Sequence, residues 1–443
     1  MARTHGPALG LGTDPKTQIN VWMRANDASS DYEIEYSTSA DLSGSTTTPT
    51  STIASATNDG TETITISGLT ADTTYYYTPV LASSRVFTSN FPTFKTLPAS
   101  MVGRTIAGGS CISRSSLDST PSVKTLDYIR ETVNPEFLAM LGDFIYAEDP
   151  TSGFTPSSDP GAATLAHYRE AYRNTYTITA VENFVRNIPT IRAISDHDVM
   201  ADFPDSDWAS NPSVYPRVDA AASYSSWANA IDAFDTEYGF DHMASPNANV
   251  AGGIRYGHFV IGTHVFITLD TRSHRNGAAG HFLGETQRHW LYGLLNTYRT
   301  GYVITILSSD TFAGAASTNR DNWEGGPAFD AALYGYLYER DAVDAACAHI
   351  SSKVIWACGD FHAALHVKTY GGIDVISASP FDDTQQSSVA SIGQAYSAEF
   401  LSSGLDNRFW TLTYGANQAV TAKIYKANAG GTNTIEEEYS VVL

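Results

Sequence analysis

Short apolar and β-branched runs dominate the first 97 residues, and turns rich in Ser, Thr, Gly and Asp separate them. This pattern is typical of strands that are buried on one face. The short, even spacing of the turns predicts an all-β sandwich over residues 1–97. We expect its strands at Ile19–Arg24, Tyr32–Tyr36, Thr61–Ile66 and Thr74–Leu81.

One turn within this region is more specific than its alternation. The stretch Gly-Leu-Thr-Ala-Asp-Thr-Thr-Tyr-Tyr-Tyr from Gly68 to Tyr77 resembles the turn before a strand in fibronectin type III domains. In such sandwiches a tyrosine hydroxyl hydrogen-bonds to the backbone a few residues upstream. Tyr75 is the candidate for this tyrosine corner. The alternative is an all-β domain of another kind.

The pattern changes after Leu97–Ser100, which reads as a linker. Strands and helices then alternate, which predicts an α/β domain over residues 98–443 with layered mixed sheets flanked by helices. Strands are expected at 104–108, 137–141, 191–194, 302–307 and 353–357, and helices at 123–133, 167–186, 285–296 and 340–349. The tail from Phe409 returns to strands. The chain is therefore expected to be multidomain.

Composition limits the classes of function. The chain of 443 residues is 42% hydrophobic and 16% charged, as in folded proteins, and carries a net charge of −21. Such a charge argues against specific nucleic-acid binding. It fits a solvated acidic surface, or a carboxylate site for hard cations. No apolar stretch reaches the ~20 residues of a transmembrane helix.

Two compositional features bear on the compartment. Three cysteines, an odd number, argue against a scaffold built on disulfides. The first ten residues lack the apolar core of a signal peptide. This fits a mature secreted chain with an added Met as well as a cytosolic protein. Abundant Ser, Thr, Asn, Gly and Tyr with sparse Lys favour a secreted, periplasmic or extracellular protein.

Polar residues follow several of the expected buried strands, where α/β sheets form their sites. They are Cys111, Asp143, the run Asp196-His197-Asp198, and Asp360 with His362. Each alone reads as a structural or capping residue. Together they are the residue types that ligate metals, so we expect a metal site with more than one ion.

Two metal ions roughly 3.5–4 Å apart can clamp an in-line displacement at phosphorus. A bridging carboxylate would reduce the repulsion between them, and Asp143, which follows a glycine, is the candidate. Tyr146 lies three residues further and could reach the same metal. A thiolate and a phenolate favour ferric iron, whereas Asp196 and Asp360 suit calcium.

The ordered motifs resemble those of the alkaline phosphatase D family of metallophosphoesterases, whose members also begin with a fibronectin-like sandwich. The matching stretches are Gly109–Cys111, Gly142–Tyr146, His167–Arg173, Ser195–Val199, Leu269–Arg272, Leu283–Gln287, Asp321–Gly325 and Gly359–His362. The resemblance extends from about residue 10 to the end of the chain. It implies a metal-dependent phosphomonoesterase or phosphodiesterase that acts on phosphate esters.

The resemblance also implies roles for individual residues. Cys111, Asp143, Tyr146 and His362 would bind Fe³⁺, and Asp143, Asp196 and Asp360 would bind Ca²⁺, although other divalent ions are possible. His197 would not be a ligand. It would act near the leaving group as a general acid or transition-state stabiliser. The expected catalytic residues are thus His197 and Asp143.

This sequence departs from the family pattern at two places. Ile194–Asp198 stands where Trp-Asp-Asp-His-Glu is common, and Ala201-Asp202-Phe203 replaces a frequent Asn-Asn-Trp. We therefore expect the contacts around the ligands, rather than the ligands themselves, to differ from those of the family. His366 and Trp323 are two further residues that could line the site.

Two other functions remain as alternatives. A purple acid phosphatase would need Asp, Asn-His-Glu and His at the places of Cys111, Asp196–Asp198 and Asp360. A non-catalytic surface-binding protein that retains the fold would be expected to have lost a ligand, and the main ones are present.

Overall fold

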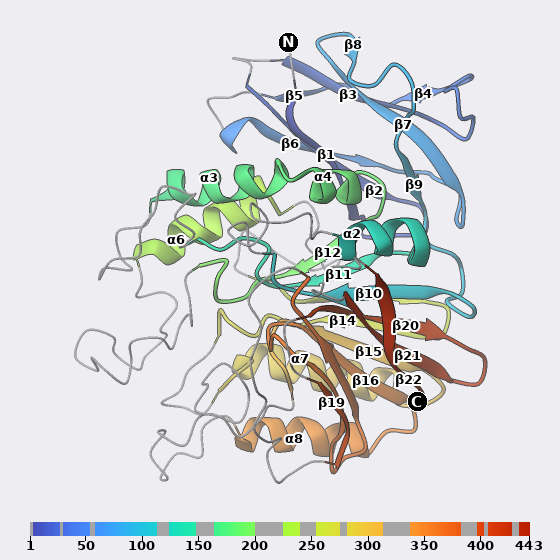
Figure 1. Ribbon diagram of the computed structural model, residues 1–443, viewed down its shortest axis with the longest axis vertical. Helices are drawn as coiled ribbons and strands as arrows, with labels where there is room; N and C mark the ends of the chain where they lie inside the picture. The colour runs from blue at the N-terminus through green and yellow to red at the C-terminus, as the bar shows by residue number, and fades with distance from the viewer. Residues whose placement is uncertain are drawn as a thin grey trace.

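The computed structural model describes residues 3–26, 30–53, 58–112, 124–147, 164–199, 225–239, 254–274, 281–312, 337–381, 397–402, 406–427 and 434–443. Their strands form three sheets, with short helices on the outer faces (Figure 1). Among these residues, no helix is both long and apolar enough to cross a bilayer.

The largest sheet has nine strands in the order β22-β21-β20-β10-β11-β12-β1-β2-β6. Strands β10, β11 and β12 run parallel to one another, and β1 runs parallel to β12. The remaining neighbours are antiparallel. The strands are β1 (Arg3–Leu11), β2 (Ile19–Ala25), β6 (Thr61–Ile66), β10 (Thr105–Gly109), β11 (Leu138–Leu141), β12 (Thr190–Ala193), β20 (Asn407–Tyr414), β21 (Val420–Ala427) and β22 (Ile435–Val442).

A second sheet has seven strands in the order β13-β14-β15-β16-β18-β17-β19. Its central strands β14, β15, β16 and β18 are parallel. The strands are β13 (Gly257–Ile261), β14 (His264–Thr268), β15 (Val303–Ser308), β16 (Lys353–Cys358), β17 (Ala364–Lys368), β18 (Asp374–Ala378) and β19 (Ser397–Ser402).

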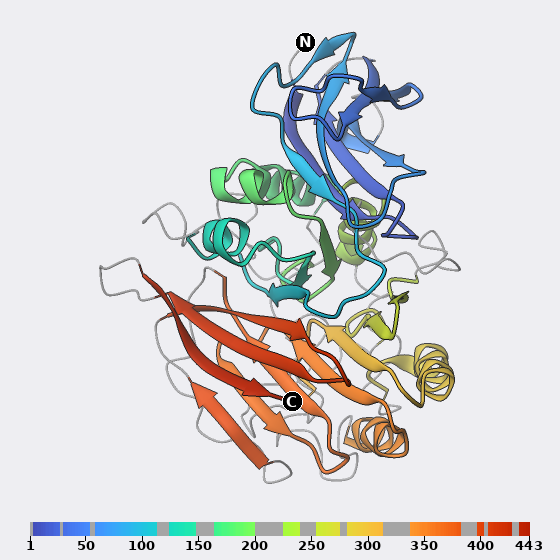
Figure 2. The same cartoon turned by 90° about the vertical axis from the view of Figure 1, so that its right-hand side faces the viewer.

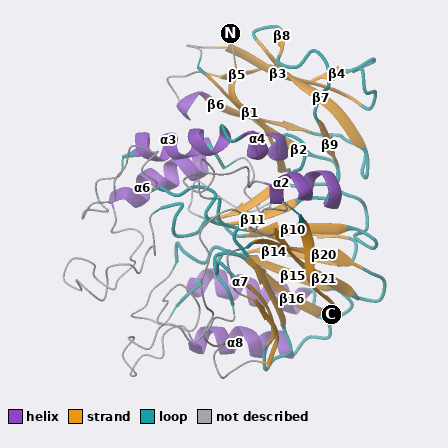
Figure 3. Ribbon diagram, in the orientation of Figure 1, coloured by secondary structure: helices purple, strands orange, loops and turns teal. Residues whose placement is uncertain are grey.

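These two sheets pack face to face and are covered by helices on their outer sides (Figures 2 and 3). Buried residues of both sheets form one apolar cluster between them. Helices α7 (Gly284–Thr297) and α8 (Leu337–Ala348) pack on the seven-stranded sheet. The outer face of the larger sheet is covered by α2 (Lys124–Tyr128), α3 (Leu165–Tyr176), α4 (Thr179–Val185) and α6 (Ser225–Ile231). The predicted layered mixed sheets with flanking helices are confirmed.

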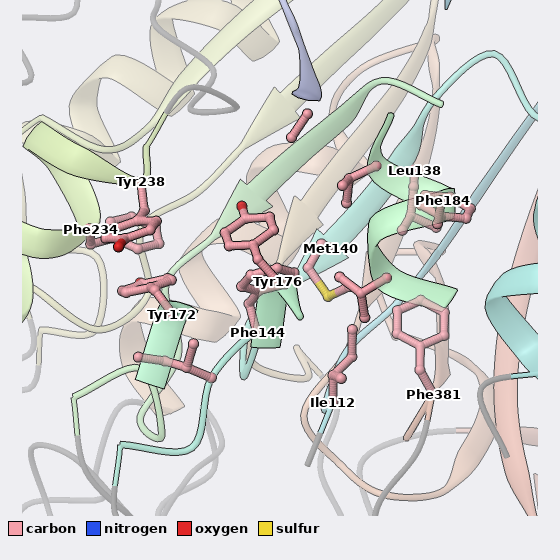
Figure 4. Close-up of a cluster of buried hydrophobic side chains, with 14 of the residues drawn as sticks. Ile112, Leu138, Met140, Phe144, Tyr172, Tyr176, Phe184, Phe234, Tyr238 and Phe381 are labelled. Atoms are coloured by element: carbon pink, nitrogen blue, oxygen red, sulfur yellow. The ribbon is translucent and has the colours of Figure 1, made fainter. Parts of the chain in front are cut away.

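Aromatic side chains fill much of the space between the larger sheet and its helices. Figure 4 shows Phe144, Tyr172, Tyr176, Phe234 and Tyr238 gathered in this cluster. Tyr172 and Tyr238 stack with ring centroids 4.5 Å apart. Such pairs add about 0.5–1.5 kcal/mol beyond the burial of their area. This packing supports the loops that follow β11 and β12.

The N-terminal strands form two packed layers. One layer consists of β1, β2 and β6, and the other of β3 (Ser30–Ser37), β4 (Thr46–Thr47), β5 (Ser51–Ile53), β7 (Thr74–Leu81), β8 (Ser84–Arg85) and β9 (Thr93–Lys95). A separate apolar cluster lies between them. The Tyr75 hydroxyl accepts a hydrogen bond from the Thr70 backbone amide at 2.9 Å, as a tyrosine corner requires.

Polar contacts fasten these N-terminal layers to the helices of the larger sheet. Asp59 binds Arg24 at 3.0 Å and Arg173 at 2.9 Å, and it accepts a hydrogen bond from Tyr238 at 2.7 Å. The indole of Trp22 donates to the backbone oxygen of Glu237 at 2.8 Å. The pairing of β1 with β12 in addition joins the strands before and after residue 97 into one sheet.

Several elements differ from the sequence predictions, and two of them have a clear physical reason. The helix expected over Val123–Val133 consists of α2 followed by a π-helical turn, η2 (Ile129–Val133). The nine-residue strand β1 was not predicted, because Gly6, Pro7 and Gly10 interrupt its alternation. A strand of this composition is stabilised by its neighbours in the sheet rather than by local preference.

Candidate metal centre

The carboxyl ends of parallel strands from both sheets meet at the candidate site. Gly142 adopts a φ of +95°, and a Cβ there would lie 2.3 Å from Cβ of Ser195. A Cβ on Gly359 would lie 2.5 Å from Cβ of Ser110. Real side chains do not tolerate such distances, so glycine is needed for the strand-end loops to approach one another.

Four of the expected ligands adopt a left-handed backbone. Their φ angles are +67° for Cys111, +52° for Asp143, +63° for Asp360 and +51° for His362. This region is uncommon for residues other than glycine, and it costs on the order of 1–3 kcal/mol for each. The fold therefore maintains local strain at the residues that the sequence singles out.

A first group of possible ligands joins Cys111, Asp143 and His362, whose ligating atoms all lie within 4.8 Å of one another. The Cys111 thiol lies 3.2 Å from Oδ2 of Asp143. The Tyr146 hydroxyl lies 3.4 Å from Nε2 of His362, so the phenol borders the same group. All four residues expected on the iron side are thus brought together.

A second group joins Asp143, Asp196 and His197 under the same 4.8 Å limit. Nε2 of His197 lies 3.8 Å from Oδ2 of Asp196. The imidazole stacks on the Tyr146 ring with centroids 4.2 Å apart, and its side chain is 23% exposed. Asp143 belongs to both groups, which is the position a bridging carboxylate requires.

The environment of Asp143 fits a cation. The residue is wholly buried, and its Oδ1 has no hydrogen-bond partner among the described residues. Burial and the neighbouring charge of Asp196 raise the pKa of the Asp143 carboxyl well above its ordinary value. A buried carboxylate with an unpaired oxygen is costly unless a positive charge compensates it. The thiol, imidazole and carboxylate donors suit a transition metal.

Asp360 lies beside these groups but belongs to neither. Its backbone amide donates to the Ser110 hydroxyl at 2.6 Å, and its Oδ1 accepts from Ser195 at 3.4 Å. Burial and the charge of Asp196 raise the pKa of its carboxyl as well. Asp360 therefore shares the acidic environment of Asp196 from the opposite sheet.

Asp198 anchors the two loops that carry Asp143 and Asp196. Its Oδ2 accepts hydrogen bonds from the backbone amides of Asp143 at 3.1 Å and Ser195 at 2.9 Å. Its Oδ1 accepts from the Ile145 amide at 3.3 Å. Burial raises the pKa of Asp198 to about 6. The short acid at this departure from the family pattern thus has a structural role.

Two further charged residues enter the site from loops of the seven-stranded sheet. They are Arg272, which follows β14, and Asp310, which follows β15. Both side chains are wholly buried, and Nη2 of Arg272 lies 2.7 Å from Oδ1 of Asp310. Arg272 ends a motif that resembles the family pattern but has no role predicted from the sequence, and Asp310 was not predicted as a site residue. Asp310 follows a buried strand, so the strand-end pattern that marked the other residues also applied to it.

A known protein family matches most of this chain. The family model described as PhoD-like phosphatase matches residues 120–430. The chain belongs to the PhoD-like phosphatase family. Membership supports a phosphatase function and the expected phosphate-ester substrate. The resemblance identified from the sequence motifs is confirmed.

One solved structure extends the likeness of this PhoD-like chain to the N-terminal layers. The structure of PhoD is 16% identical, covers 99% of this chain and 90% of its own, and has a TM-score of 0.75. This TM-score shows that the two chains share a fold. GAP50, the anchor in the inner membrane complex of Plasmodium, is 13% identical over 75% of this chain and 88% of its own, with a TM-score of 0.41. None of the curated proteins compared with the chain matches it.

His366 lies away from the candidate ligands. His366 contacts the Tyr439 hydroxyl at 2.8 Å and Asp374 at 3.1 Å, rather than the candidate ligands. Trp323 and its motif Asp321–Gly325 lie outside the described residues, as does the run Ala201–Phe203.

Proposed function

We propose that this PhoD-like phosphatase hydrolyses phosphate monoesters or diesters at a centre of iron and calcium that shares Asp143. The observation that carries the proposal is the pair of ligand groups with Asp143 in common, one of whose buried oxygens lacks a hydrogen-bond partner among the described residues. A carboxylate in this position suits two cations better than one proton.

The donor types suggest how the ions would divide. Cys111, Tyr146 and His362, with Asp143, would hold Fe³⁺, because thiolate, phenolate and imidazole suit a strongly Lewis-acidic transition metal better than they suit Ca²⁺. Asp143, Asp196 and Asp360 would hold Ca²⁺ through hard carboxylate oxygens. When bound, such ions would polarise the phosphoryl group and supply a hydroxide at neutral pH.

His197 is the proposed general acid. It is partly exposed and is held between the Tyr146 ring and Asp196. From this position a protonated imidazole could donate its proton to the departing alkoxide. A role as metal ligand is the alternative, because His197 also lies among the ligand-type residues.

The N-terminal residues 1–97 are proposed to form a fibronectin III-like sandwich that supports the catalytic residues 98–443. All candidate ligands lie after Gly109, whereas the earlier residues supply strands and docking contacts. A secreted location remains a proposal that rests on composition.

Metal removal and substrate screening test the function together. The purified chain should hydrolyse nitrophenyl phosphate or bis-nitrophenyl phosphate, and prolonged treatment with a calcium chelator should abolish turnover. Added Ca²⁺ should restore turnover. The ratio of the rates on nitrophenyl phosphate and bis-nitrophenyl phosphate would assign monoester or diester preference. Undiminished turnover after verified removal of metal would contradict the proposal.

A further inference from the structure

Arg272 lies inside the candidate metal centre, although the proposed function assigns it no role. Its side chain is 0% exposed. Nη2 lies 3.2 Å from Oδ1 of Asp196 and 3.1 Å from Oδ2 of Asp360. One guanidinium group therefore contacts two of the three carboxylates that are proposed for calcium, and these two come from different sheets.

Asp310 is a third carboxylate in contact with this guanidinium. Its Oδ1 lies 2.7 Å from Nη2 of Arg272, and its own side chain is 0% exposed. The Thr271 hydroxyl donates to the second oxygen of Asp310. Arg272 Nη2 also donates to the Ser195 hydroxyl at 3.3 Å. These contacts converge on Nη2, so this nitrogen is restrained and holds Asp196 and Asp360 close to each other.

The contacts distinguish the two oxygens of each carboxylate. Arg272 contacts Oδ1 of Asp196, whereas Oδ2 of Asp196 faces His197 at 3.8 Å. Arg272 contacts Oδ2 of Asp360, whereas Oδ1 of Asp360 accepts a longer bond of 3.4 Å from Ser195. Hydrogen bonds to one oxygen of a carboxylate orient the other oxygen toward a metal.

We propose that Arg272 is a positioning residue for the calcium side of the centre. It holds one oxygen of Asp196 and one oxygen of Asp360, and it leaves a single oxygen of each to bind the metal ion. Asp310 keeps the guanidinium in place and balances its charge. The inference rests on the proposed function, because the ion concerned is the Ca²⁺ assigned there.

Position and charge predict opposite effects, which makes the inference testable. A positive charge alone repels Ca²⁺, so its loss would tighten binding, whereas loss of carboxylate orientation weakens binding. Arg272→Lys keeps the charge but lacks the planar fork. In the full-length chain, with calcium removed and iron retained, Ca²⁺ alone is titrated by calorimetry. We expect Arg272→Lys to lower calcium affinity by about 10–100-fold, the range for partners of metal ligands.

Arg24→Lys is the matched control. Arg24 is also buried and paired with a carboxylate, Asp59, but it lies in the N-terminal layers. This variant should bind Ca²⁺ like the wild type. The iron content of Arg272→Lys should also equal that of the wild type, since Arg272 contacts carboxylates of the calcium side. Thermal unfolding of the calcium-depleted proteins establishes that both variants fold.

Wild-type calcium affinity in Arg272→Lys would overturn the inference, most clearly if Arg272→Gln bound Ca²⁺ more tightly. If Arg272→Lys fails to fold, Asp310→Asn replaces it, because this change weakens the shortest of the guanidinium contacts described above. Unchanged calcium affinity in Asp310→Asn would also overturn the inference. A wild-type chain that binds no Ca²⁺ would contradict the proposed function itself. The two failures are distinguishable because only the second is visible without any variant.

Discussion

The carboxylate of Asp198 accepts a hydrogen bond from the backbone amide of Asp143, 3.1 Å away. The same oxygen accepts from the Ser195 amide at 2.9 Å. One buried side chain thus fixes the loops after β11 and β12 relative to each other. The distance between Asp143 and Asp196, and hence the shape of the second ligand group, depends on it.

Replacement of Asp198 by Asn should therefore affect both stability and metal binding. The amide cannot accept at both ends, so at least one buried N–H loses its partner at a cost of about 1–3 kcal/mol. We expect a lower melting temperature and weaker metal retention. Asp344→Asn is the control. The Asp344 carboxylate also accepts a hydrogen bond from a backbone amide, that of Gly371 at 2.8 Å, but it contacts none of the candidate ligands described. Equal metal retention in both variants would contradict the anchoring role.

The protein is expected to be coloured. A Cys111 thiolate or a Tyr146 phenolate on ferric iron should give a visible charge-transfer band, and both residues border the first ligand group. Absorption spectra of Cys111→Ser and Tyr146→Phe, with iron content measured, test this expectation. An iron-containing protein whose spectrum is unchanged in both variants would rule out these two ligands.

His197→Ala should harm some substrates more than others. Alkyl alcohols are poor leaving groups and need a proton, so their esters should lose about 10²–10⁴-fold in rate. Nitrophenyl esters should lose little, because nitrophenolate departs as a stable anion. The measurement is kcat/KM on both ester classes at verified metal content. An equal loss on both would assign His197 to metal binding, as its proximity to Asp143 and Asp196 would allow.

Acid should weaken the attachment of the N-terminal layers through Asp59. Burial alone would raise the pKa of this carboxyl, but the hydrogen bonds from Arg24 and Tyr238 and the charge of Arg173 hold it below its ordinary value. A depressed pKa in the folded state stabilises the protein above the unfolded value of about 3.9, and this contribution is lost as pH falls through the folded pKa.

Asp59→Asn removes this pH-dependent contribution. We expect the variant to be less stable than the wild type at pH 7, and the difference in melting temperature to shrink as the pH is lowered below about 4. Thermal unfolding across this range measures it. A difference that stays constant with pH would show that the charge of Asp59 does not stabilise the fold.

The sequence predicted those strands whose alternation of apolar and polar residues is regular. The strands at Ile19–Ala25, Thr61–Ile66 and Thr74–Leu81 lie where alternation indicated them, and the strand-end rule found the residues of both ligand groups. The pairing of β1 with β12 joins Gly10 to Thr190. No feature of either segment encodes this partner, because it arises from the packing of distant layers.

The same limit explains the residues that were missed at the site. Arg272 gains its meaning from Asp196 and Asp360, which lie 76 and 88 positions away in the sequence. A basic residue after a strand has no ligand-type signature of its own. The role of Asp198 was likewise hidden, since a short acid beside a ligand reads as another ligand until its backbone partners are known.

The shared position of Asp143 is the central claim, and metal stoichiometry tests it most directly. Iron and calcium are measured by mass spectrometry in the purified wild type, in Asp143→Asn and in Asp196→Asn, each shown to be folded. We expect both metals in the wild type, loss of both in Asp143→Asn, and loss of calcium alone in Asp196→Asn. Full retention of both metals in folded Asp143→Asn would contradict this claim.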